Sequence, residues 1–274
     1  MRNLRWAFLL LLLVPHISDA RQSTLSERIE PDVLARMKSA QWTERSEAFR
    51  KAVTLVASGR ESAETVEKLR LGLIELLVTE TAASRDPSTI VRDEEREGYS
   101  NYSGNLIGAV ADLKDARAIP ALLGVADTGG MATRGLAHFG KTALDPVLKQ
   151  VNDKDPQLAE GALFVIRDML EYRTVRDNDS RARIKNALQS ALARPNMFIR
   201  ESTIYAIEYL DDREKFVQTL TEVAKSDPFK LQGQVATDGQ DNGAVYPVRR
   251  MARVLLAKIA NHEAPIVDRG VPAP

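Results

Sequence analysis

The sequence contains no cysteine, and its charges balance. Without cysteine the chain can form no disulfide and offers no thiolate for a zinc site. Lysine and arginine together number 38, and so do aspartate and glutamate, which leaves no net charge. Nucleic-acid-binding proteins usually carry a basic excess. We therefore expect no nucleic acid among the partners.

Long apolar runs are also missing, apart from Trp6 to Val14 near the start of the chain. Arg2 and Arg5 precede this run, and Ser18-Asp19-Ala20 follows it with small residues at the positions that a signal peptidase reads. A membrane-spanning helix needs about 20 apolar residues, so this run is too short to span a bilayer. The pattern is typical of a secretory signal peptide cleaved after Ala20. We expect a periplasmic or secreted protein with no stable membrane anchor after cleavage.

Helical spacing dominates the remaining sequence, and strand-like alternation is absent. The segment Arg181 to Ala193 shows one buried stripe at the spacing i, i+3, i+4, i+7, i+8. Its members are Ile184, Ala187, Leu188, Ala191 and Leu192. The next helix, Asn196 to Leu210, is predicted to bury Ile199, Thr203, Ile204, Ala206, Ile207 and Leu210.

Twelve such helices are predicted, with Gly, Pro and Asp residues between them. They cover residues 32–38, 44–57, 62–79, 104–113, 116–126, 131–139, 142–151, 156–172, 181–193, 196–210, 212–225 and 247–260. From 104 onward consecutive helices are expected to pair, and the last one has no clear partner. A single amphipathic pair cannot bury both of its faces, so such pairs form arrays.

One pattern recurs where several of these helices begin. It is seen in Met131-Ala-Thr-Arg134, Asp155-Pro156-Gln-Leu-Ala, Phe198-Ile199-Arg200 and Pro247-Val248-Arg249, while second helices read Ala118-Ile119-Pro120 and Ala143-Leu144-Asp-Pro146. On these residues the segment from about Gly104 to Ala260 resembles HEAT-type repeats, in particular the short HEAT-like units of phycobilisome lyases. The resemblance implies an all-α fold, an α-solenoid of HEAT-like antiparallel helix pairs with an armadillo-type superhelix.

The domain organisation predicted from these patterns has five parts. They are a signal peptide at 1–20, N-terminal helices at 21–83 that form a divergent repeat or a cap, a polar loop at 84–103, HEAT-like repeats at 104–260 with a loop insertion at 229–246, and a flexible tail at 261–274.

The resemblance also gives a role to the arginine of the repeated pattern. In such repeats this arginine reaches the turn of a neighbouring unit. Arg134, Arg200 and Arg249 fit that role, and the candidate partners are Asp153, Asp155, Asp211 and Asp227. The functional alternative is a row of arginines that binds an anionic ligand.

No motif for catalysis or metal binding stands out. A Gly-x-Ser-x-Gly turn and a phosphate-binding glycine loop are both missing. After signal cleavage only His138 and His262 remain, far apart in the sequence, and His138 is best interpreted as a packed or capping residue. A pair of catalytic carboxylates stays open, because acidic residues are numerous. We expect no catalytic residue, no metal and no cofactor.

Two acidic segments have simple structural interpretations. Asp93-Glu94-Glu95 is predicted to be a solvated face. The segment Asp238 to Gly243 lacks the spacing of an EF-hand calcium loop and is predicted to be a flexible turn, with Asn242-Gly243 closing a small hairpin.

These observations favour a non-enzymatic scaffold that binds a protein partner. In a HEAT-like array the second helices line the concave face, so that face and the loops at 84–103 and 229–246 are the predicted binding surfaces. The predicted partner-binding residues are Lys149, Gln150, Arg181, Arg183, Lys185, Gln189, Lys215, Gln218 and Glu222. The alternative is an enzyme or accessory subunit of lyase or isomerase type, and a third hypothesis is a nucleic-acid enzyme such as a DNA glycosylase.

Overall fold

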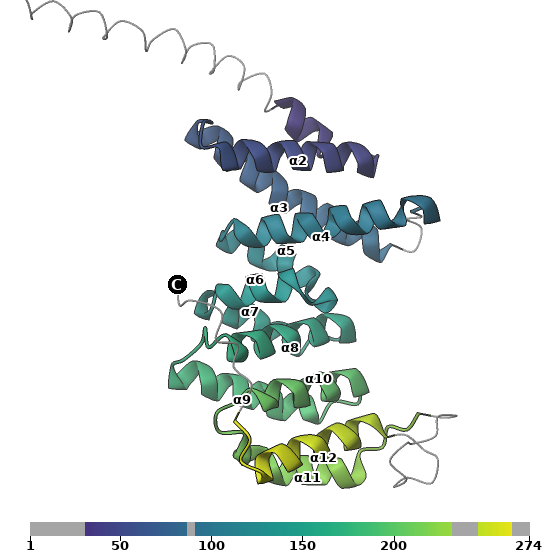
Figure 1. Ribbon diagram of the computed structural model, residues 1–274, viewed down its shortest axis with the longest axis vertical. Helices are drawn as coiled ribbons and strands as arrows, with labels where there is room; N and C mark the ends of the chain where they lie inside the picture. The colour runs from purple at the N-terminus through teal and green to yellow at the C-terminus, as the bar shows by residue number, and fades with distance from the viewer. Residues whose placement is uncertain (1–30, 87–90, 232–245, 265–274) are drawn as a thin grey trace, which may run out of the picture. The chain divides into compact units, whose positions relative to one another are not determined.

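The computed structural model describes residues 31–86, 91–231 and 246–264 (Figure 1). Helices are the only regular elements of these residues, which confirms the predicted all-α class. The chain forms two compact units, unit 1 up to Val110 and unit 2 from Ala111. The predicted signal peptide and hairpin lie outside the described residues, as does most of the predicted tail.

Unit 1 is built from a short helix at residues 31–36, α2 (Trp42–Ser58), α3 (Ala63–Arg85) and nearly all of α4 (Arg96–Asp112). The predicted end of α2 at Gly59 is confirmed, since Gly59 has a left-handed backbone with φ of 63°. Ser62 caps α3 by accepting a hydrogen bond from the Thr65 amide. Helix α3 continues beyond the predicted end at 79, because Glu80 occupies the next buried position of its stripe.

The expectation of a polar loop over 84–103 is wrong for its second half. A 3-10 turn at η1 (Asp93–Glu95) leads directly into α4, which begins at Arg96 rather than at Gly104. Gly98 and Gly104 are poor helix formers. The aromatic ring of Tyr102 offsets them, because it is buried against Trp42 and Phe49 of α2.

Unit 2 is a succession of short helices close to the predicted ones. They are η2 (Ala116–Ala118), α5 (Ile119–Gly124), η3 (Ala126–Thr128), α6 (Met131–His138), α7 (Lys141–Val151), α8 (Pro156–Glu171), α9 (Asn178–Leu192), α10 (Met197–Glu208), η4 (Arg213–Phe216), α11 (Val217–Ser226) and α12 (Pro247–Ala260).

The helices of unit 2 stack in two layers (Figure 1). In the first layer α6 packs on α8, α8 on α10, and α10 on α12; in the second layer α5 packs on α7, and α7 on α9. This stack confirms the predicted α-solenoid. Its apolar stripes meet between the layers. The five α10 residues predicted to be buried are buried, and so is Leu210, which follows α10. On α9 the same holds except for Ala187, which is half-buried.

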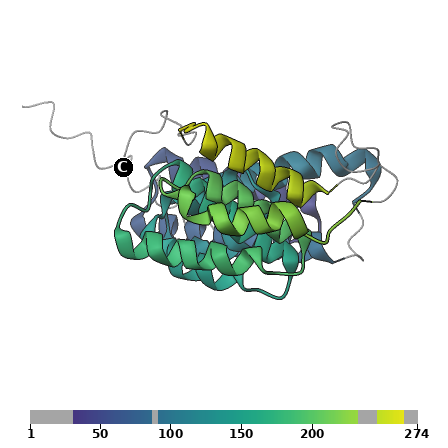
Figure 2. The same cartoon turned by 90° about the horizontal axis from the view of Figure 1, so that it is seen from below.

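The pairing of helices differs from the prediction. The close partners are α7 with α8, α9 with α10, and α11 with α12, so each second-layer helix packs on the first-layer helix that follows it. Turns 152–155 and 193–196 are short and bring the helices that they join side by side. Helix α12, which was expected to lack a partner, lies along α11 in both views (Figures 1 and 2).

Candidate functional site

Most of the second-layer residues predicted to bind a partner form contacts within the molecule. On α9, the guanidinium of Arg181 lies 2.5 Å from the Asp211 carboxylate, and the Lys185 ammonium lies 2.7 Å from Asp212. Gln189 donates a hydrogen bond to the hydroxyl of Thr219 on α11 over 3.2 Å. These three side chains follow one face of α9 and connect it to the next part of the stack.

Two of the other predicted residues also contact neighbouring segments, and three have only local partners. Arg183 pairs with Asp145 of α7 at 2.5 Å, and Gln150 donates to the carbonyl oxygens of Leu123 and Leu158 over 3.0 and 3.1 Å. The remaining contacts are Lys215 to Asp212 at 2.9 Å and Gln218 to Glu222 at 3.5 Å. Lys149 alone among the nine is exposed with no side-chain partner among the described residues.

Asp212 contacts two lysines of this face, Lys185 and Lys215. Burial opposes its ionisation, but the ammonium groups of Lys185 and Lys215 outweigh burial and lower the pKa of its carboxyl. Exposed ion pairs of this kind add little stability each. They do pair the charges of Arg181, Arg183 and Lys185 with acids of the same molecule, whereas Lys149 stays exposed.

The arginines of the repeated pattern divide into two groups. Arg200 is buried and forms two hydrogen bonds with the Asp227 carboxylate, at 2.6 and 3.0 Å, as predicted. Arg249 donates to the backbone carbonyl of the same Asp227 over 2.7 Å and stacks 4.0 Å above the ring of Tyr246. Both therefore hold the chain where α11 ends.

The expected role of Arg134 is wrong. Its side chain is exposed and pairs with none of the described residues. The buried positions in the first turn of α6 are Ala132 and Thr133, so position 134 faces solvent. His138 is exposed as well and ends α6. Its ring stacks on Tyr172, and its Nδ1 lies 2.7 Å from the Arg134 carbonyl oxygen, which fits the predicted packed or capping residue.

The start of α8 lacks the arginine of the repeated pattern. Arg194 from the following turn supplies the missing contacts by donating to the carbonyls of Val151 and Asp153 over 2.5 and 2.6 Å. The arginines that contact turns therefore hold the stack together, and we assign them no ligand.

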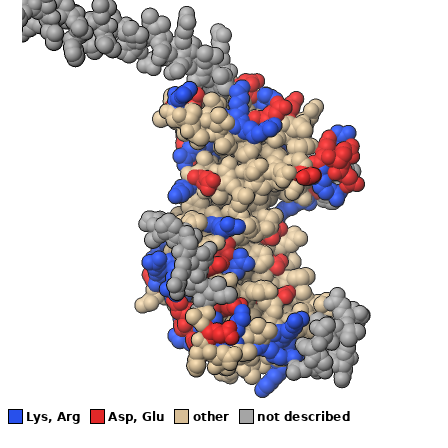
Figure 3. Space-filling model, viewed as in Figure 1, with Lys and Arg blue, Asp and Glu red and all other residues tan. Residues whose placement is uncertain are grey.

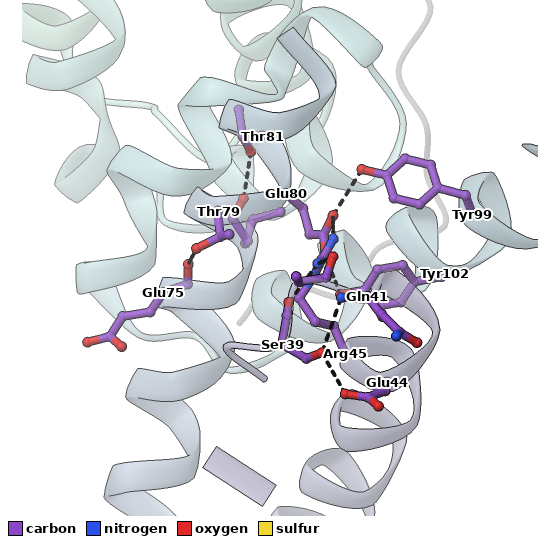
Figure 4. A network of polar contacts seen from close by, with 12 residues as sticks. Ser39, Gln41, Glu44, Arg45, Glu75, Thr79, Glu80, Thr81, Tyr99 and Tyr102 are labelled. Carbon is purple, nitrogen blue, oxygen red and sulfur yellow. Dashed lines mark hydrogen bonds and ion pairs between the residues drawn. The ribbon is translucent and has the colours of Figure 1, made fainter. Parts of the chain in front are cut away.

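A buried polar cluster in unit 1 is the strongest candidate for chemistry by composition (Figure 4). Glu80 of α3 is 2% exposed. Its carboxylate accepts two hydrogen bonds from Arg45 of α2, one from the Tyr99 hydroxyl at 2.9 Å and one from the Tyr102 hydroxyl at 2.8 Å. Sequence inspection missed this cluster, because its members come from three helices.

The geometry of this cluster is structural rather than catalytic. A carboxylate has about four acceptor sites, and all four of Glu80 are occupied. Burial, followed by the Glu80 carboxylate, raises the pKa of Tyr99 to about 12 and that of Tyr102 further. Neither phenol ionises near neutral pH, and Glu80 has no acceptor site left for a substrate.

An open groove lies between α10 and α12 in the first layer of unit 2, with a volume of about 350 Å³. We call it the α10–α12 groove. Its floor is formed by the buried side chains of Ile204 and Leu255 with the half-buried Met251. Tyr205 and Val254 line it while remaining 48% and 50% exposed.

Charged side chains also line the α10–α12 groove. Glu208 of α10 and Lys258 of α12 form an ion pair at 2.5 Å. Glu201 also belongs to α10, and Arg250 to α12. Figure 3 shows this side of unit 2, where α8 and α10 are largely neutral with scattered acidic groups, and basic groups gather towards α12.

Two further hollows lie in unit 1. One of about 380 Å³ lies between α2 and α4, beside Trp42, Phe49 and Asn101. The other, of about 260 Å³, lies beside Leu34 and Leu71. Neither has an exposed aromatic side chain comparable to Tyr205 at its edge.

The described residues were also searched for metal-binding clusters and membrane-spanning helices. No group of three or more histidine, aspartate and glutamate side chains there is arranged to hold a metal ion. Asp93, Glu94 and Glu95 form ion pairs with Arg92 and Arg96 at the surface, which confirms the predicted solvated face. No helix of these residues is both long and apolar enough to cross a bilayer.

No protein-family model matches the chain, and a comparison with curated protein sequences finds no match. Solved structures with similar helix arrangements include designed armadillo repeat proteins for modular peptide recognition (15% identity, TM-score 0.37, covering 83% of this chain and 98% of that one). Another is the HEAT-like repeat protein of the archaeon Thermococcus onnurineus NA1 (12% identity, TM-score 0.42, covering 89% and 93%). A designed armadillo protein in complex with a (KR)4 peptide is 17% identical, with TM-score 0.36 and coverage of 83% and 98%. At these values the likeness says nothing about ligands, and the class, an α-solenoid of stacked helix pairs, rests on the helix packing described above.

Proposed function

We propose that this protein is a non-enzymatic scaffold that binds a protein partner on its stacked helices in the periplasm or outside the cell. The α10–α12 groove carries this proposal. Tyr205 and Val254 lie half exposed beside an apolar floor, on helices that are fixed by packing on α8 and α11. Clustered exposed apolar groups on a rigid surface are typical of protein-binding sites.

The second-layer face is the weaker candidate. A partner that engaged Arg181 or Lys185 would have to replace ion pairs that these residues already form with Asp211 and Asp212. Lys149 forms no such ion pair with the described residues, so a partner could bind it directly. The proposed binding surface therefore moves from the predicted second-layer residues to the first layer.

Site-specific cross-linking in the cell of origin tests the function. A photoreactive phenylalanine analogue replaces Tyr205, Lys149 or Arg134 in the full chain, and adducts are resolved by gel and mass spectrometry. We expect one discrete protein adduct from position 205 and none from position 134, an exposed site on α6 outside the groove.

The outcomes distinguish binding at the α10–α12 groove from binding at the second-layer face, and they also test the scaffold function. An adduct from position 149 alone would support the scaffold function but would place the binding surface in the second layer. If none of the three positions gives a discrete adduct, the scaffold function is rejected. Edman sequencing of protein from the periplasmic or culture fraction tests the location, with Arg21 expected as the first residue.

A further inference from the structure

Resting on that function, we propose that the partner at the α10–α12 groove is a second copy of this chain, related to the first by a two-fold axis that runs along the groove. The groove offers apolar surface for such a contact. Ile204 and Leu255 form its floor, and Tyr205 and Val254 stand half exposed beside it. Contact between two copies there removes this apolar surface from water, which favours association.

The charges that line the groove differ in sign between its two helices. The acids Glu201 and Glu208 belong to α10, and the bases Arg250 and Lys258 belong to α12. A partner segment that carries charge of one sign would be attracted by one helix and repelled by the other. A second copy presents the same two helices, so its basic helix can lie on the acidic helix of the first copy while its acidic helix lies on the basic one.

Two of these four charges have no partner within the molecule. Glu208 and Lys258 form their ion pair of 2.5 Å near the ends of α10 and α12. Glu201 and Arg250 line the groove near the starts of the same helices, and neither forms an ion pair or hydrogen bond through its side chain with the described residues. The two helices therefore run in the same direction, with one unpaired acid on the first and one unpaired base on the second.

The unpaired charges and the exposed apolar groups occupy matching positions in the two helices. Buried residues follow one another at the same spacing in both, namely Ile199, Thr203 and Ala206 in α10 and Val248, Ala252 and Leu255 in α12. In this register Glu201 matches Arg250, and Tyr205 matches Val254. Rotation about an axis along the groove exchanges α10 with α12 and keeps their direction. It brings Glu201 of each copy to Arg250 of the other, and at the same time Tyr205 to Val254 of the other.

The same charges disfavour a two-fold axis that runs across the groove. Such an axis would place α10 on α10 and α12 on α12, so acids would meet acids and bases would meet bases. The axis along the groove also extends the two stacks in opposite directions, because α8 packs on the side of α10 away from α12. Only two helices of each copy then overlap. An interface of this size lies at the small end of the known range, so we expect association at micromolar concentration.

Sedimentation equilibrium of the full chain tests this proposal through two charge reversals. Glu201→Arg and Arg250→Glu should each weaken self-association by at least about tenfold, because both symmetric contacts then join like charges. An equal mixture of the two variants should associate within about threefold of the unchanged chain, since each contact again joins opposite charges. The matched controls are Glu222→Arg on α11 and Lys149→Glu on α7, exposed charges outside the groove, which should dimerise as the unchanged chain does.

Single cysteines test the direction of the axis, because the chain contains none of its own. Tyr205→Cys mixed with Val254→Cys should form a disulfide-linked dimer faster than either variant does alone, since position 205 of one copy lies against position 254 of the other. Faster linkage in Tyr205→Cys alone would contradict the axis along the groove.

Two further results would overturn the proposal. One is a chain that stays monomeric up to about 100 µM. The other is a dimer that Glu201→Arg weakens no more than Glu222→Arg does, while helicity and melting temperature are unchanged. In cells the adduct from position 205 should have twice the mass of the chain. A discrete adduct with a different protein would overturn the second copy as the partner and leave the scaffold function in place, whereas the absence of any adduct at the three positions would reject that function.

Discussion

Arg45 in unit 1 and Arg200 in unit 2 make the same set of contacts. Each guanidinium forms two hydrogen bonds with one buried carboxylate further along the chain, Glu80 within α3 for Arg45 and Asp227 at the end of α11 for Arg200. Each also donates through Nη1 to the carbonyls five and six positions before it in the chain. We infer that α2 and α3 form a divergent repeat rather than a cap.

This relationship predicts that both arginines are structural. Arg200→Ala should lower the free energy of unfolding of unit 2 by about 3–5 kcal/mol, because it leaves the Asp227 carboxylate buried and unpaired. Arg45→Ala should do the same to unit 1 through Glu80. Urea unfolding followed by circular dichroism measures both losses.

The matched control is Arg134→Ala, which removes an exposed arginine without a partner among the described residues. It should change stability by less than about 0.5 kcal/mol. Arg200→Lys should fall between the two, since an ammonium keeps the charge but loses the planar pair of bonds. Equal stability of Arg200→Ala and Arg134→Ala would contradict a structural role.

The pKa of Tyr99 predicts a loss of stability in alkali. Burial and the Glu80 carboxylate raise this pKa from 10.0 to about 12, so the folded protein holds the phenol proton more tightly than the unfolded chain. The resulting stability is present below pH 10 and is lost as the pH rises from 10 towards 12. The Tyr102 pKa is raised as well, which acts in the same direction.

Tyr99→Phe separates this effect from general alkaline unfolding. It should cost about 1–2 kcal/mol at neutral pH, because a hydrogen bond to a charged acceptor is lost. Its stability should then fall less steeply with pH than that of the unchanged protein. Parallel urea titrations across the alkaline range measure the slope, and identical slopes would show that Tyr99 is not the titrating group.

Two glycines predict opposite responses to the same substitution. A Cβ at Gly161 of α8 would lie 2.5 Å from the Asp127 amide nitrogen and 2.8 Å from the Ala126 carbonyl carbon, so Gly161→Ala forces α8 away from η3. We expect a loss of about 1–3 kcal/mol. Gly104→Ala in α4 meets nothing within 4 Å and should stabilise that helix by about 0.5–1 kcal/mol. Thermal melts of the two variants should shift in opposite directions.

The buried stripes predict a third contrast. Ile204→Asp or Leu188→Asp should unfold unit 2, because each places an unpaired charge between stacked helices at a cost of several kcal/mol. Lys185→Ala should leave the melting temperature nearly unchanged, since its ion pair with Asp212 is partly exposed. A soluble and fully helical Ile204→Asp protein would refute the phase assigned to α10.

The sequence predicted where most helices lie and which of their faces are buried. Capping residues and apolar spacing act over one or two turns, so Gly59 and the stripe of α9 could be located from the chain alone. The start of α4 was missed because Tyr102 stabilises it through a contact with α2. For Arg134 the buried positions of α6 fall at Ala132 and Thr133, so the side chain that was predicted to reach a neighbouring turn faces solvent.

The sequence by itself determined an all-α protein of short amphipathic helices, because backbone hydrogen bonding and the spacing of apolar residues are local properties. Only the tertiary structure decided which helices pair, how Glu80 and Asp227 are neutralised, and which face keeps exposed apolar groups. These depend on side chains from separate helices meeting at distances of a few ångströms. Such meetings are fixed by the stacking of the whole array, which no single segment encodes.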